Sequence, residues 1–152
     1  MNIRTNGLEI LGPVDPEQRP KLRLPLFLAG VQAGFPSPAD DFIDKRLDLN
    51  EHLIQHPAAT FFVRAVGDSM LGAGIHDGDL LIVDRAVEAQ AGKIVIAAVN
   101  GELTVKRLER RGQRMLLVPA NADFLPIDIT DALDSGEGFE VWGVVTSVIH
   151  KL

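Results

Sequence analysis

The second half of the chain consists of short apolar segments separated by turn-forming residues, which is the pattern of β-strands. Lys93–Val99 is almost wholly apolar, as expected for a strand buried on both faces. Asn100 and Gly101 follow, a pair typical of a two-residue hairpin turn, so we expect 102–111 to return as the partner strand. The same pattern predicts further strands at 61–66, 80–83, 114–119, 126–129 and 139–149. The chain therefore has a mainly β fold class.

The segment 38–55 lacks the strand pattern of the second half, and the spacing of its apolar residues favours one or two short helices. Asp48 suits the N-cap of the second helix, with Glu51 three residues later, and Pro57 ends it. We therefore expect a small helical element ahead of the strands.

Two histidines in this region have a spacing that can hold a metal ion on a helix. His52 and His56 are four residues apart, but the sequence shows no third ligand beside them. We expect a solvated helix face there, and the sequence predicts neither a metal site nor a cofactor.

The first 33 residues predict an extended, flexible arm. They contain four prolines, which exclude a long helix, and the segment is too short and broken for a helix-turn-helix domain. From Leu24 to Pro36 the arm becomes apolar, although its prolines and glycines prevent a helix. This part is either a strap packed on the domain or a peptide that lies in a cleft, and the pattern leaves both open.

Composition narrows the classes of protein. A length of 152 residues suits one domain with a short arm, and the absence of cysteine excludes disulfides, thiolate nucleophiles and zinc–thiolate sites. No apolar run has the length of a membrane span, and the start lacks a signal-peptide pattern, so we expect a cytoplasmic protein without a membrane partner. The net charge of −6 argues against direct, sequence-specific DNA binding.

A candidate nucleophile lies where the first strand of the second half ends. Gly67 and Asp68 are turn formers, so Ser69 falls at a bend that can present its hydroxyl in a cleft, next to Met70. A Gly-rich turn and a second apolar strand follow. Serine alone is a poor nucleophile and needs a base nearby.

Lys106 is a candidate base. If Asn100 and Gly101 form the hairpin turn, Lys106 lies opposite Val95 and shares a strand face with Thr104 and Leu108. Next to an apolar strand a lysine loses hydration, and desolvation lowers its pKa. An ordinary solvated lysine remains the alternative on this pattern, and His76 is a rival base that follows Ser69 closely.

Three segments of the chain, in the order in which they occur, resemble motifs of the self-cleaving LexA/UmuD family (peptidase family S24). The members of this family are serine peptidases with a Ser-Lys dyad. The three segments are Gly67-Asp68-Ser69-Met70, the run Gly74-Ile75-His76-Asp77-Gly78-Asp79-Leu80-Leu81-Ile82-Val83-Asp84, and Thr104-Val105-Lys106-Arg107-Leu108. The segments 34–39, 48–50 and 53–57 are similar to the UmuD-type mutagenesis proteins of the family, and the resemblance extends from about residue 24 to 148.

The resemblance implies a complex β fold like that of LexA and signal peptidase, with Ser69 as nucleophile and Lys106 as general base. It places the scissile bond between Ala33 and Gly34, so that 1–33 is removed and 34–152 is the peptidase domain. Ala29–Gly30 is a second bond between small residues, but the Phe-Pro-Ser-Pro run follows only Ala33–Gly34. Met70 is named as the neighbour of the serine, whose surrounding backbone N–H groups stabilise the oxyanion in this family.

The resemblance also implies partners. A RecA filament on single-stranded DNA stimulates cleavage during the SOS response to DNA damage, and the trimmed homodimer joins a UmuC-type polymerase for translesion synthesis. A LexA-type repressor, a signal peptidase and a non-catalytic polymerase-interaction module are the alternatives. The first needs a DNA-binding domain that 1–33 does not supply, and the second needs a membrane anchor.

Overall fold

The computed structural model of the chain describes residues 3–5, 8–13, 21–27, 30, 33–34 and 43–152. It divides into two compact units, one formed by Met1–Val14 with His56–Leu152 and the other by Asp15–Gln55. Within the described residues, no helix is long and apolar enough to cross a membrane.

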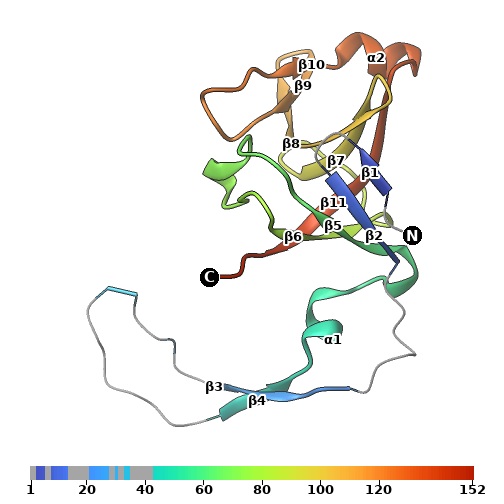
Figure 1. Cartoon of the computed structure of the whole chain (residues 1–152). Coiled ribbons are helices and arrows are strands. Elements are labelled where there is room, and N and C mark those ends of the chain that lie inside the picture. The colour runs from blue at the N-terminus through green and yellow to red at the C-terminus, as the bar shows by residue number, and fades with distance from the viewer. Residues whose placement is uncertain (1–2, 6–7, 14–20, 28–29, 31–32, 35–42) are drawn as a thin grey trace. The chain divides into compact units, whose positions relative to one another are not determined.

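The larger unit is built on a nine-stranded sheet whose neighbouring strands are antiparallel (Figure 1). The strand order is β1-β2-β5-β6-β11-β7-β8-β9-β10. The strands are β1 Ile3–Thr5, β2 Leu8–Pro13, β5 Thr60–Arg64, β6 Leu80–Asp84, β7 Ile94–Val99, β8 Glu102–Arg111, β9 Arg114–Val118, β10 Ile127–Asp128 and β11 Phe139–Ile149. Short helices η2 Pro57–Ala59, η3 Leu71–Ala73 and α2 Thr130–Ser135 lie between them. The predicted mainly β fold class is confirmed, and each strand predicted after residue 60 is present.

The longest strand, β11, joins the two halves of the sheet. It pairs with β6 along one edge and with β7 along the other (Figure 1). Val144 therefore has partners on both sides, Asp84 and Val95. The register shifts between Val141 and Gly143, where a Cβ on Gly143 would lie 2.6 Å from the buried Val83 Cγ1. A bulge with glycine therefore lets the strand bend over the core.

The core has two clusters of buried apolar side chains. One contains Met70 and Ile75 from the turn after β5, together with strand residues such as Val105. The other gathers around Val95, Leu117 and Val144. The segment that carries Ser69 is thus anchored in the first cluster by its next residue, Met70, whose side chain is buried.

The β7–β8 hairpin has the predicted register. Asn100 and Gly101 have φ of +50° and +82°, the left-handed conformation that a two-residue turn of this type requires. Val99 lies opposite Glu102 and Val95 opposite Lys106. The turn therefore fixes which side chains of β8 lie beside the apolar β7 strand.

The smaller unit contains a two-stranded sheet, β3 Leu24–Phe27 with β4 Ile43–Leu47, and the helix α1 Leu49–Leu53. Asp48 caps α1 by accepting a hydrogen bond from the Asn50 N–H, as predicted. The expectation of a helix before it is wrong over Ile43–Leu47, because pairing with β3 overrides the local preference of that segment. The described beginning of the apolar stretch, Leu24–Phe27, is extended as predicted.

The start of the chain joins the main sheet. β1 pairs with β2, and β2 pairs with β5, the strand that leads toward Ser69. The sequence predicts only an extended arm over 1–33, whereas two strands form there because β2 pairs with the distant strand β5. Removal of 1–33 by cleavage stays a prediction.

Candidate active site

Ser69 lies at a bend five residues after β5 ends and is half-buried. The backbone before it is held by the turn that precedes β6. Ala65 donates its N–H to the Asp79 carbonyl and accepts from the Gly78 N–H, each at 2.8 Å. Gly67 has φ of +92°, and its N–H donates to Asp77 Oδ1 at 2.7 Å. Glycine adopts a positive φ more readily than other residues, so Gly67 lets the chain turn ahead of the serine.

A second segment holds Ser69 from the other side. The Ala120 N–H, just after β9, donates to the Ser69 carbonyl at 2.8 Å, and the Gly72 N–H donates to the Ala120 carbonyl at 2.7 Å. Asn121 Nδ2 donates to the Asp68 carbonyl at 2.8 Å. The backbone on both sides of the serine is thus fixed by sequence-distant contacts, and sequence analysis did not predict them.

Lys106 points from β8 to the serine. Its Nζ lies 3.0 Å from Ser69 Oγ, 2.8 Å from Thr104 Oγ1 and 3.0 Å from the Val105 carbonyl oxygen. The predicted neighbours of the lysine, Ser69 and Thr104, are therefore both present. The hairpin register and the glycine turn bring a hydroxyl and an amine together across 37 positions of sequence.

The surroundings of Lys106 disfavour its charged form. The residue is only 8 % exposed, and within the described part of the chain no carboxylate forms an ion pair with it. Burial lowers the pKa of the Lys106 amine below its ordinary value, because desolvation penalises the ammonium ion. A lysine in this state can act as a base nearer to neutral pH.

The three oxygens around Nζ match the three N–H donors of an ammonium, and a neutral amine can be arranged among them as well. The neutral amine has two N–H donors and one lone pair. The N–H bonds can donate to Thr104 Oγ1 and to the Val105 carbonyl, which leaves the lone pair for the Ser69 hydroxyl proton. This arrangement can remove that proton and so activate the hydroxyl as a nucleophile.

The peptide group that follows Ser69 carries an N–H donor, that of Met70. The Met70 carbonyl accepts from the N–H groups of Ala73 and Ile75, whereas the Met70 N–H takes part in no hydrogen bond among the described residues. An N–H group beside a nucleophile can stabilise the negative oxygen of a tetrahedral intermediate. Met70 thus presents a backbone group of the kind expected of an oxyanion site.

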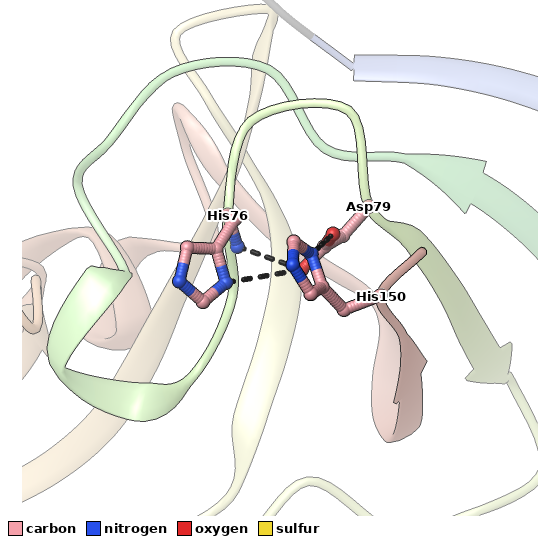
Figure 2. A group of neighbouring side chains, drawn as sticks. All are labelled: His76, Asp79 and His150. Atoms are coloured by element: carbon pink, nitrogen blue, oxygen red, sulfur yellow. Dashed lines mark hydrogen bonds and ion pairs between the residues drawn. The ribbon is translucent and has the colours of Figure 1, made fainter. Parts of the chain in front are cut away.

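The rival base lies elsewhere. His76 points toward Asp79 and His150, as Figure 2 shows, and its Nδ1 is 3.6 Å from Asp79 Oδ2. Its ring lies against that of His150, with 4.5 Å between the ring centroids. Lys106 is therefore the base that the geometry favours.

The two histidines with helical spacing do not lie on the same helix. α1 ends at Leu53, and His56 lies outside it with Nδ1 2.6 Å from Asp84 Oδ2. His52 is exposed on α1. The helix is thus too short to bring both rings to one face.

The residues of the expected scissile bond lie in the smaller unit. Ala33 and Gly34 form an exposed bend, and Gly30 is also exposed, while Ala29 lies outside the described residues. A Cβ built on Gly30 or Gly34 would meet no described atom within 4 Å. Cleavage at Ala33–Gly34 stays a prediction.

Comparison with known proteins gives a family and several relatives. The model of the Peptidase S24-like family matches residues 25–146. The chain is 48 % identical to protein SamA of Salmonella typhimurium over 139 residues, which cover 91 % of this chain and 94 % of SamA. It is 47 % identical to protein ImpA of Escherichia coli over 91 % of this chain and 92 % of ImpA.

A LexA repressor is a more distant relative. The protein of Alteromonas mediterranea is 37 % identical over 147 residues, which cover 97 % of this chain and 68 % of the repressor. The mainly β fold, with two sheets and few helices, agrees with the expectation of a LexA/UmuD-like fold.

Proposed function

The chain belongs to the Peptidase S24-like family, and we propose that it is a serine endopeptidase that cleaves its own Ala33–Gly34 bond. The observation that carries the proposal is the 3.0 Å separation of Lys106 Nζ from Ser69 Oγ in a site where burial lowers the pKa of the lysine. The resemblance of 24–57 to self-cleaving relatives supports the choice of bond.

The reaction follows from the groups around the serine. Lys106 takes the Ser69 hydroxyl proton while Oγ attacks the Ala33 carbonyl carbon, and the Met70 N–H faces the resulting oxyanion. When the C–N bond breaks, the Lys106 ammonium returns the proton to the Gly34 nitrogen. Ala33 is then an ester of Ser69, which water hydrolyses with Lys106 again acting as base.

An intramolecular substrate suits this site. A substrate tethered to the same chain or to a partner copy has a high effective concentration, which can compensate for a slow nucleophile. The small residues on both sides of the bond allow the carbonyl to approach the serine closely. The apolar strand β3 and the exposed bend at Ala33 are the features that would enter the site.

The biological role proposed here is that of an SOS mutagenesis protein. In this role a RecA filament on single-stranded DNA stimulates cleavage after DNA damage, and the trimmed homodimer supports a UmuC-type translesion polymerase. The resemblance of 34–39, 48–50 and 53–57 to UmuD-type proteins and the similarity to SamA and ImpA support this part. Cleavage in the absence of any partner tests the chemistry separately from the role.

The pH dependence of self-cleavage tests Lys106 as the base. The neutral fraction of an amine rises tenfold per pH unit until its pKa is reached. We expect the first-order rate to rise with pH and then level off below the ordinary lysine pKa of 10.5, since burial lowers the Lys106 pKa. Timed gel or mass analysis between about pH 6 and pH 11 measures it. A rate that falls as the pH rises would exclude Lys106 as the base.

A pair of glycine substitutions tests the scissile bond. Gly34→Val should slow cleavage at least about a hundredfold, because a branched side chain at the bond hinders the approach of the carbonyl to Ser69. Gly30→Val is the matched control, since neither glycine has a positive φ or a described atom near its Cβ position. Intact mass identifies the bond that is cut. Cleavage blocked by Gly30→Val and unaffected by Gly34→Val would move the site to Ala29–Gly30.

A further inference from the structure

Two histidines and a buried carboxylate meet at one end of the main sheet, outside the Ser69 site. His76 and Asp79 belong to the turn between η3 and β6, and His150 directly follows β11 (Figure 2). One ligand atom from each of the three residues lies within 4.8 Å of the others. The turn and the end of the chain's last strand are thus joined by groups that all bind metal ions in other proteins.

We propose that His76, Asp79 and His150 bind one divalent transition-metal ion of the zinc class. Two imidazoles with one carboxylate are a common ligand set for such ions, and solvent can complete the coordination. Mg²⁺ and Ca²⁺ prefer several oxygen ligands, and the cluster supplies one carboxylate only. The ligand types therefore select zinc and its neighbours in the series.

The carboxylate is already oriented. Asp79 is 3 % exposed, and its Oδ2 accepts a hydrogen bond from the His76 N–H at 2.8 Å. Its Oδ1 lies 2.5 Å from His150 Nδ1, and its Oδ2 lies 3.6 Å from His76 Nδ1. Both Nδ1 atoms thus face the same carboxylate, and a cation can take the place of the hydrogen bond between His150 and Asp79.

The site is open to an ion from solvent. The side chains of His76 and His150 are 49 % and 42 % exposed, so their rings can move and at least one face of the cluster is hydrated. The nitrogen of a neutral imidazole is a common ligand for ions of this class.

Binding of the ion would reinforce the backbone before Ser69. Asp79 accepts the Ala65 N–H through its carbonyl, and Asp77 in the same turn accepts the Gly67 N–H. An ion held by the turn and by His150 therefore ties the C-terminal end of β11 to the strand exit that positions the serine. This proposal does not depend on peptidase activity, because its readout is binding and stability.

Titration calorimetry with ZnCl₂ at about pH 7.5 tests the site on the full chain carrying Ser69→Ala, which keeps 1–33 attached. We expect one ion per chain and a higher thermal midpoint with zinc, reversed by a chelator. His76→Gln and His150→Gln should each weaken binding at least about tenfold. Asp79 is left unchanged, because its side chain holds the turn.

His52→Gln is the matched control, because His52 is exposed on α1 in the other unit and belongs to no described metal cluster. It should leave the affinity unchanged. The proposal is overturned if zinc does not bind, or if the His76 and His150 variants bind as tightly as the control. In that case the three side chains form only a hydrogen-bonded link between β11 and the turn.

Discussion

Ser69→Ala should leave a folded chain that does not cleave itself at any pH, with a rate lower by at least about 10³-fold. The substitution removes only the hydroxyl whose oxygen lies 3.0 Å from Lys106 Nζ. Ser69 is held in place through its backbone carbonyl, which accepts from the Ala120 N–H, so the turn has no need of the side chain. Intact mass over days of incubation, together with a thermal melt, measures both effects.

Ser147→Ala is the control for the loss of a hydroxyl. Ser147 is a half-buried serine of β11, opposite Ile82 and on a different element from the candidate site. Its variant should cleave at the rate of the unchanged chain. Continued cleavage by Ser69→Ala at that same rate would remove Ser69 from the mechanism.

Lys106→Met should abolish cleavage without weakening the fold. Methionine keeps much of the length of lysine and removes the base, so the Ser69 hydroxyl keeps its proton. Burial of an amine that favours neutrality is costly to the fold at neutral pH, and an apolar chain of similar volume avoids this cost. We therefore expect a free energy of unfolding at pH 7 that is equal to or higher than that of the unchanged chain, measured by denaturant titration in the Ser69→Ala background.

The chains with and without Lys106→Met should also differ in how the free energy of unfolding depends on pH. Because the folded pKa of Lys106 lies below the ordinary value of 10.5, the unfolded chain binds more protons between the two pKa values. The contribution of Lys106 to the stability then rises with pH across this window and is constant below it. Lys106→Met should lack that rise, whereas Lys93→Met, at an exposed lysine before β7, should keep it. A lower free energy of unfolding for Lys106→Met than for the unchanged chain at pH 7 would contradict the expectation that the buried amine destabilises the fold.

The register of the β7–β8 hairpin, and with it the position of Lys106, could be predicted from the sequence. Asn100-Gly101 determines the turn, the turn determines the register, and the register places Lys106 opposite Val95 beside Thr104. These steps are local in sequence and depend on backbone geometry that two residue types impose. The N-cap at Asp48 was predictable for the same reason.

Contacts between distant segments could not be predicted in this way. The hydrogen bonds of Ala120 and Asn121 to the serine turn depend on where β9 ends relative to β5, which no local pattern specifies. The pairing of β3 with β4 likewise turned a segment with helical appearance into a strand. The cluster of His76 with His150 joins residues 74 positions apart only because β11 pairs with β6.

The most direct test of self-cleavage is the intact mass of the purified chain after incubation at about pH 7 and about pH 10, beside Ser69→Ala. We expect a product that begins at Gly34, forms faster at the higher pH because more Lys106 is neutral, and is absent from the variant. A chain that remains whole at both pH values while its fold is intact, or that is cut equally in Ser69→Ala, would contradict the account.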